Sequence, residues 1–193
     1  MSVYPTPATV AASPGVPSLT RLFAKLRAGS IAPTLNLLWV PAVSAALIVL
    51  AGAVGVWLKQ PWLFAGLAPT IVMVAATPGH ETTSFRAIVV GHLAAVACGY
   101  LALLLLNATA APTMIATRIV PMDRVWASAA AMAMLVIVQP QLKAYHPPAA
   151  ATALLVTLGA YRMTGKTPLV LVGSVVLIAI ASELLKRVRP RGR

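Results

Sequence analysis

The chain alternates between long apolar runs and short polar or proline-containing segments. Four of the runs carry at most one charged residue and approach the ~20 residues that a helix needs to cross a ~30 Å hydrocarbon core. The pattern therefore predicts four full-length transmembrane helices, over residues 35–58, 87–106, 125–142 and 169–185.

Two further apolar pieces, "QPWLFAGLAPTIVMVAAT" and "QPQLKAYHPPAAATALLVTLGA", are interrupted by prolines. After Pro69 only residues 70–77 remain, and after Pro148 only residues 149–160. These lengths correspond to roughly 12 and 18 Å of helix, which is too short to span a bilayer. We predict two short, proline-broken membrane helices.

The two interrupted pieces share one pattern at one spacing. Each has the order Gln-Pro-x-Leu-x-Ala-x-x-x-Pro, which begins at Gln60 in the first piece and at Gln139 in the second. Since a full apolar run precedes and follows each piece, the chain is interpreted as a duplicated unit of helix, broken helix and helix. Broken helices at matching places in two repeats often mark a transport site. An alanine-rich composition also produces such matches by chance, so the repeat is a hypothesis.

The composition assigns the chain to a class. Hydrophobic residues make up 60% and charged residues 9%, whereas about a quarter of the residues of a soluble domain are charged. We therefore predict an all-α integral membrane protein with its transmembrane domain over residues 30–188. With three acidic residues and no paired nucleophile and base, we expect no enzyme and no cofactor. The three histidines are far apart and Cys98 is the single cysteine, so neither a metal site nor a disulfide is expected.

The net charge of +12 comes from fifteen basic residues against three acidic ones. The basic residues lie in the tails and between the apolar runs, where they set membrane orientation and attract anionic headgroups, so nucleic acid is not an expected partner. Basic clusters near both ends predict cytoplasmic termini at the cell membrane, and hence an even number of crossings. There are four crossings if the broken pieces re-enter and six if they span.

Three segments lie outside the predicted membrane domain. Residues 1–17 are rich in Pro, Ser, Thr and Ala and are predicted to be disordered. Residues 18–29 have apolar positions at helical spacing with basic residues largely opposite, which predicts an amphipathic helix on the membrane surface. Residues 189–193 form a basic tail.

The sequence "YHPPAAATALL" predicts the start of a helix at membrane depth. Proline is tolerated in a first helical turn, so Pro147 and Pro148 mark the start, and the amides of residues 149–151 are expected to be free to face an anion. His146 stands just before this point. It either lines a cavity or holds the broken backbone by a hydrogen bond, and one residue can do both.

Two other polar sites each leave two interpretations open. In the second predicted span, His92 shares a face with the small residues Ala95 and Gly99, which predicts close helix packing. His92 is then either a buried, hydrogen-bonded residue or a pore ligand. In the loop before this span, Glu81 and Arg86 either form an ion pair or border a vestibule in which Arg86 concentrates anions.

The run Tyr145-His146-Pro147-Pro148-Ala149-x-Ala151-Thr152-Ala153-Leu154 resembles the HPP family of integral membrane proteins, named for its His-Pro-Pro motif. The later "LVLVG" and Arg86 with Val90-Gly91-His92 support the resemblance, which covers residues 35–187. The chain departs from the family in having Phe85 before the arginine, Val90 in place of a second glycine, and Thr70 and Ile71 after Pro69. The resemblance implies a compact helical membrane domain with a transport function, and plant relatives are linked to nitrite.

Together these features predict a passive channel or transporter for a small inorganic anion, namely nitrite, which crosses as the anion or as its conjugate acid. Arg86 and Lys143 raise the local anion concentration, and His146 orients the site or couples it to a proton. The small bundle is expected to form a homo-oligomer in the lipid bilayer. The alternative is a membrane scaffold or sensor subunit whose HPP motif is structural. The candidate pathway residues are Thr70, Thr77, Arg86, His92, Lys143, His146, Pro147, Pro148, Ala149 and Thr152.

Overall fold

The computed structural model describes residues 33–160 and 167–188. Within these residues there are seven α-helices and two short 3-10 helices, with no strand. The chain divides by its contacts after Asn36. The unit from Leu37 onward contains all of the described residues except the first four residues of the first helix. The predictions for residues 1–17, 18–29 and 189–193 lie outside the described residues.

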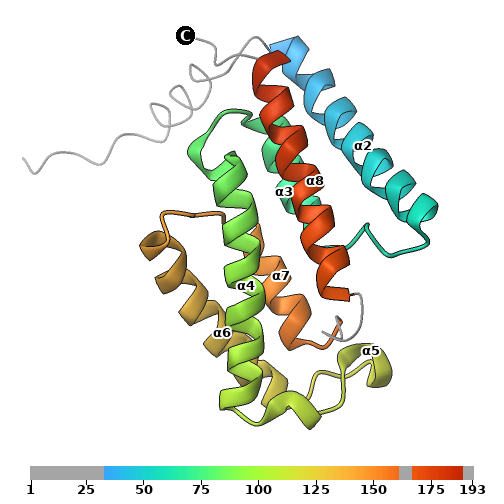
Figure 1. The fold of residues 1–193 in the computed structure, drawn as a ribbon. Coiled ribbons are helices and arrows are strands. Elements are labelled where there is room, and N and C mark those ends of the chain that lie inside the picture. The colour runs from blue at the N-terminus through green and yellow to red at the C-terminus, as the bar shows by residue number, and fades with distance from the viewer. Residues whose placement is uncertain (1–32, 161–166, 189–193) are drawn as a thin grey trace, which may run out of the picture. The chain divides into compact units, whose positions relative to one another are not determined.

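Four long apolar helices confirm the predicted full-length spans (Figure 1). They are α2 (Pro33–Leu58), α4 (Phe85–Leu105), α6 (Met122–Gln141) and α8 (Thr167–Val188). Both ends of each helix lie within three residues of the predicted ends. The difference matters at α6, which was expected to begin at Val125 and instead begins at Met122. Arg124 is therefore part of the helix and does not lie in the loop before it.

Two short helices occupy the places of the proline-broken pieces. They are α3 (Leu67–Ala76), with 10 residues, and α7 (Ala149–Thr157), with 9 residues. At 1.5 Å per residue they are roughly 15 and 14 Å long, about half the thickness of a hydrocarbon core. The connections contain η1 (Glu81–Thr83), η2 (Ala108–Ala110) and the single-turn α5 (Met114–Thr117).

The order long helix, short helix, long helix occurs twice, as α2–α3–α4 and as α6–α7–α8. The predicted duplication of this unit is thus present in the order of the elements. The matching prolines have different places, however. Pro69 is the third residue of α3, whereas Pro148 precedes α7 as its N-cap.

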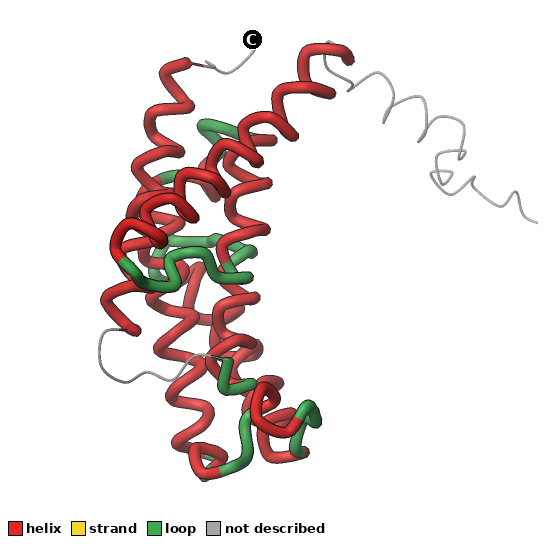
Figure 2. The backbone as a smooth tube through the Cα atoms, turned by 90° about the vertical axis from the view of Figure 1, so that its right-hand side faces the viewer, coloured by secondary structure: helices red, strands yellow, loops and turns green. Residues whose placement is uncertain are grey.

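Helix α4 is the centre of the unit and packs against α6, α7 and α8 (Figure 1). One core cluster joins α2, α3, α4 and α8 through large side chains such as Ile71, Ile88 and Ile178. The contact of α4 with α6 and α7 is made instead by small residues, including Ala95, Cys98 and Ala153. Small side chains bring helix backbones close together. The view in Figure 2 shows loop segments within the helical unit as well as at its ends.

The predicted small-residue face on α4 lies against α7. A Cβ atom added at Gly99 would come within 3.1 Å of both the Ala153 carbonyl oxygen and the Val156 side chain. Contacts of 3.0–3.4 Å are tighter than ordinary van der Waals packing, so a larger residue here would push the two helices apart. This close approach places α7 directly beside α4, where His92 also lies.

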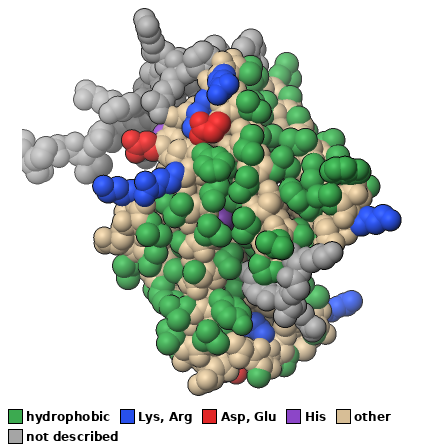
Figure 3. Space-filling model, in the orientation of Figure 1, with side chains coloured by type: hydrophobic (Ala, Val, Ile, Leu, Met, Phe, Trp, Pro, Cys, Tyr) green, Lys and Arg blue, Asp and Glu red, His purple; other side chains and the backbone are tan. Residues whose placement is uncertain are grey.

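The outer surface of the long helices is largely apolar (Figure 3). Large hydrophobic side chains stand exposed on them, including Trp57 on α2, Leu104 on α4, Val136 and Ile137 on α6, and Leu169 on α8. Water-facing helices of a soluble protein rarely expose contiguous apolar area on this scale. The surface therefore suits lipid, and the protein is an all-α membrane protein.

Candidate functional site

Four polar side chains meet in the interior of the unit, where the two short helices approach α4. They are Thr70 on α3, His92 on α4, His146 just before α7, and Thr152 on α7, and all four are fully buried. Buried polar groups in a membrane domain are costly unless they are paired. These four are among the ten predicted pathway residues, and the fold brings them together from positions up to 82 residues apart.

Short hydrogen-bond contacts join the four side chains into one chain. Thr70 Oγ1 lies 3.0 Å from the Nε2 atoms of both His92 and His146. His92 Nδ1 lies 2.8 Å from Thr152 Oγ1. His146 Nδ1 lies 2.7 Å from the backbone oxygen of Thr82, in η1. The imidazole rings of His92 and His146 have their centroids 5.2 Å apart and an angle of 52° between their planes. The hydroxyl of Thr70 bridges the two rings.

The hydrogen-bonding capacities of these groups fix the direction of the chain when both histidines are neutral. A carbonyl oxygen only accepts, so His146 Nδ1 donates to Thr82 and His146 Nε2 must accept from Thr70. The hydroxyl of Thr70 has a single hydrogen, so its second contact is an acceptance from His92 Nε2. His92 Nδ1 then accepts from Thr152. Every donor therefore points from Thr152 toward Thr82.

Gln139, in the last turn of α6, holds the backbone of the His146-Pro147-Pro148 segment, the HPP segment, in place. Its amide oxygen accepts from the His146 N–H at 3.2 Å, and its amide nitrogen donates to the His146 carbonyl oxygen at 3.2 Å. The amide nitrogen also approaches the Gly91 carbonyl oxygen at 3.5 Å. Because α6 ends at Gln141, the backbone that follows has no helical partners, and the Gln139 side chain supplies hydrogen bonds to it.

Two glycines make room for the chain. A Cβ atom at Gly91 on α4 would lie 2.7 Å from the Cβ atom of His146. A Cβ atom at Gly66, just before α3, would lie 2.7 Å from Oγ1 of Thr152. Both distances are below what real Cβ contacts show, so only glycine permits the observed approach at these two positions.

The expectation of free amides at the start of α7 is wrong. The N–H groups of Ala149, Ala150 and Ala151 donate to the carbonyl oxygens three residues earlier, at 3.0 to 3.2 Å. This tight first turn uses the donors that would otherwise face an anion. The start of α3 is closed in the same way by its first two amides, and Pro69 then has no N–H to offer. At the starts of α3 and α7, side chains and not free amides therefore face the interior of the unit.

A cleft of about 420 Å³ opens beside the HPP segment. Its lining includes Thr82, His80 and Glu81 from the connection before α4, and Lys143 and Tyr145 from the connection before α7. The carbonyl oxygen of Thr82 is also the acceptor for His146, so the buried chain ends at the wall of this cleft.

Arg86 is exposed near this cleft but does not pair with Glu81. Its Nη2 atom donates to the carbonyl oxygen of Leu142 at 3.1 Å, next to the cleft residue Lys143. The ion pair that the structure gives for the described residues is between Glu183 and Lys186 on α8, and Glu183 also accepts from the Phe85 N–H at 2.9 Å. The predicted Glu81–Arg86 ion pair is therefore absent, and the role of Arg86 as a cationic border stays a prediction.

The remaining candidates are not members of the buried chain. Thr77 is exposed at the far end of α3, and its hydroxyl donates to the Met73 carbonyl oxygen of its own helix. Pro147 is exposed, whereas Ala149 is buried in the small-residue contact with α4 and α6. In the part of the chain that the structure describes, no group of three His, Cys, Asp or Glu residues is placed to hold a metal ion.

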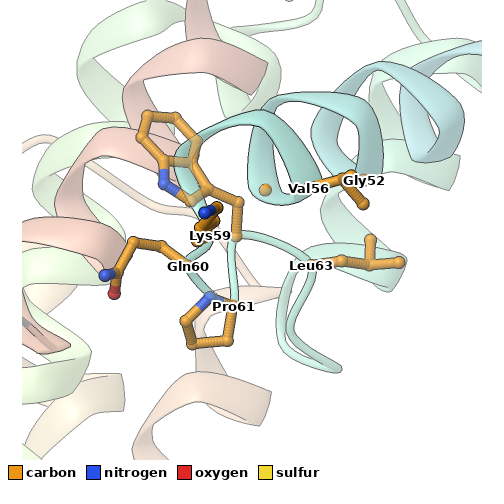
Figure 4. A pocket seen from close by; sticks show the side chains of 8 residues that line it. Gly52, Val56, Lys59, Gln60, Pro61 and Leu63 are labelled. Carbon is orange, nitrogen blue, oxygen red and sulfur yellow. The ribbon is translucent and has the colours of Figure 1, made fainter.

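Two further hollows lie on the side of the 60–66 connection. One, of about 400 Å³, is lined by Phe64 and Ala65 before α3 and by Leu155 on α7, among others. The other, of about 460 Å³, lies where α2 ends and is bordered by Lys59, Gln60 and Trp62 (Figure 4). The second is an open groove whose lining shares no residue with the histidine chain, so we do not assign the site to it.

Sequence reasoning missed Thr82, Gln139, Gly66 and Gly91 as parts of the site. Thr82 and the glycines act through the backbone, so their side-chain types gave no chemical signal. Gln139 did give one, because it is a polar residue inside a predicted span and heads the second copy of the repeat pattern.

Comparison with known proteins identifies one family. The sequence model described as the HPP transmembrane region matches residues 30–191, which is most of the chain. Searches of curated proteins and of solved structures give no match.

Proposed function

The chain belongs to the HPP transmembrane family, and we propose that it transports a small inorganic anion, nitrite, through the site around His146. The observation that carries the proposal is the fully buried chain of Thr70, His92, His146 and Thr152 between the two short helices. A membrane domain gains nothing in stability by burying four such groups in place of apolar ones, and polar groups of this kind usually serve transport. Broken helices in matching places of two repeats support the same interpretation.

The charges near the cleft favour an anion. Lys143 lines it, and Arg86 lies beside it on the Leu142 carbonyl oxygen. Glu81 also lines the cleft, so the cationic excess there is modest. The four buried side chains include no acidic residue that would repel an anion from the interior.

A structural role is the second candidate, and one observation favours it. The ring nitrogens and hydroxyl groups of the buried chain all have hydrogen-bond partners within the protein, so the chain is complete without a substrate. A membrane scaffold or sensor subunit would need the HPP segment only to hold α3, α4 and α7 together. Complete pairing of a buried network rigidifies a core.

Three further properties belong to the proposal. Cytoplasmic termini in the cell membrane follow from the basic ends of the chain. A homo-oligomer would cover part of the exposed apolar surface of a bundle this small. The protein is proposed to act without enzymatic chemistry.

Nitrite uptake by the purified full chain in proteoliposomes separates the two candidate functions. We expect the initial rate to exceed that of protein-free liposomes and to saturate with nitrite concentration, because a finite number of sites carries the flux. Liposomes containing heat-denatured protein control for leaks caused by reconstitution. A rate equal to that of protein-free liposomes, with protein that elutes as a single folded species, would remove nitrite as the substrate and support the scaffold.

A further inference from the structure

We propose that the cleft beside the HPP segment is a site for one anionic phospholipid, whose headgroup phosphate binds Lys143 and Arg86 and whose acyl chains lie along the outer face of α4. The occupant is a lipid of the membrane and not a soluble ion. This inference goes beyond nitrite transport and does not depend on it, because a lipid can bind whether or not the protein carries an ion.

Two cations from different elements meet at this cleft. Lys143, in the connection after α6, is exposed and lines it. Arg86, in the first turn of α4, is held beside Lys143 because its Nη2 atom donates to the carbonyl oxygen of Leu142 at 3.1 Å. A guanidinium has five N–H donors, and this bond uses one of them. The two side chains therefore offer two positive charges and several donors to one anionic group.

The other polar groups of the cleft suit a phosphate group. Tyr145 lines it with an exposed side chain whose hydroxyl can donate. His80 also lines it, and its Nδ1 atom accepts from the Thr82 N–H at 3.3 Å, so in the neutral ring the Nε2 atom carries the hydrogen. Glu81 is the acidic residue in the lining, so two cations stand against one carboxylate.

The cleft is larger than a small inorganic anion needs. Its volume is about 420 Å³. A water molecule takes about 30 Å³ of liquid, and a three-atom ion such as nitrite is only slightly larger. Pockets that hold organic ligands measure about 300–1,000 Å³. The cleft therefore has room for an organic headgroup, and nitrite would fill only a small part of it.

An apolar strip continues from the cleft along α4. Its members Val90, Leu93 and Ala97 follow Arg86 at i+4, i+7 and i+11, which places them on the same face of the helix. Leu93 and Ala97 are exposed, and Val90 is half-buried. A ligand at this place meets positive charge at one end and an apolar helix face along the rest of its length. This arrangement matches a phospholipid and not a soluble phosphate.

The cleft lies at the end of the unit where α8 also ends (Figure 1). Ser182 on α8 donates to the carbonyl oxygen of Thr83, in the connection before α4. Glu183 accepts from the Phe85 N–H at the start of α4. The proposed cytoplasmic position of the C-terminus therefore places the cleft at the cytoplasmic leaflet. Anionic lipids in that leaflet attract basic groups near its surface, and basic pockets between membrane helices bind their headgroups.

The test measures lipid binding to the purified full chain in detergent micelles by native mass spectrometry, with phosphatidylglycerol and phosphatidylcholine of the same acyl chains. We expect the first phosphatidylglycerol to bind more tightly than phosphatidylcholine. Lys143→Gly should weaken phosphatidylglycerol binding about fivefold, as one basic residue near a membrane surface does, and Arg86→Gln should have a similar effect. Glycine suits the backbone of Lys143, whose φ is 50°, so this variant should keep the fold.

Lys59→Gly is the matched control. Lys59 is an exposed lysine with a φ of 53° just after α2, and the groove that it lines shares no residue with the cleft. Its replacement should leave phosphatidylglycerol binding unchanged. Equal losses from Lys59→Gly and Lys143→Gly would show a general effect of charge and would overturn the site, as would equal affinities for the two lipids.

Glycerol 3-phosphate distinguishes a lipid site from a site for soluble phosphates, because it carries the phosphate without acyl chains. At the same concentration as the lipid, it should leave phosphatidylglycerol bound. Displacement of the lipid under these conditions would show that the apolar strip contributes nothing and would overturn a phospholipid as the occupant. These measurements contain no nitrite, so they can fail while nitrite transport stands, and the reverse also holds.

Discussion

Arg124→Met is expected to lower the free energy of unfolding by about 3 kcal/mol or more, because it leaves three carbonyl groups without their donor. The guanidinium is buried in α6 and donates to the carbonyl oxygens of Ala111, Pro112 and Thr157 at 2.6 to 3.2 Å. Thr157 is the last residue of α7, where helix carbonyls lack partners and carry partial negative charge. Methionine keeps much of the volume but offers no hydrogen.

Arg118→Met is the matched control for this loss. Arg118 lies in the same connection region but is exposed, so its replacement should change the free energy of unfolding by no more than about 0.5 kcal/mol. Arg124→Lys should recover only part of the stability, since an ammonium cannot present the planar fork of donors that reaches three carbonyls. The measurement is the midpoint of thermal unfolding in one detergent. Equal midpoints for Arg124→Met and Arg118→Met would show that the buried contacts do not stabilise the fold.

Gly91→Ala is expected to destabilise the protein by about 1–3 kcal/mol and to impair nitrite uptake, because the new methyl group overlaps the HPP segment. The added Cβ atom would lie 2.7 Å from His146 Cβ and 3.4 Å from the Ala144 carbonyl oxygen. Relief of this overlap moves His146 away from Thr70 and lengthens a contact that now measures 3.0 Å. Stability and transport should therefore fall together.

Gly52→Ala separates this overlap from the general effect of replacing a helical glycine. Gly52 lies within α2, and no atom lies within 4 Å of a Cβ atom added there. Alanine favours a helix over glycine by about 1 kcal/mol, so this variant should be as stable as wild type or more so. Unfolding midpoints and uptake rates measured side by side provide the comparison. Similar behaviour of the two variants would mean that the approach of α4 to the HPP segment is not needed.

The helices could be predicted from the sequence because their signal is local. Length and apolarity distinguish the long helices from the two short ones, and the prolines mark where the short ones begin. The end of a helix is less well defined, and the error of three residues at the start of α6 placed Arg124 in a loop. A buried arginine that binds only backbone carbonyls leaves no pattern of acidic partners from which it could be recognised.

The members of the site could be predicted better than their arrangement. Polar residues in apolar segments stand out, which identified Thr70, His92, His146 and Thr152. Their mutual contacts join residues 22 to 76 positions apart and depend on how α3, α4 and α7 pack. The free amides expected at the start of α7 were wrong because the first turn closes on the carbonyl groups of the HPP segment itself.

We propose that nitrite crosses the membrane at His146, and the most direct test is the initial uptake rate of His146→Ala relative to wild type. Both are measured in proteoliposomes with equal amounts of folded protein. We expect the rate to fall to that of protein-free liposomes. Ser174→Ala removes a buried hydroxyl that is bonded to the Leu171 carbonyl oxygen within α8, and it should keep a rate within about twofold of wild type. A folded His146→Ala protein that takes up nitrite as fast as wild type would contradict the account.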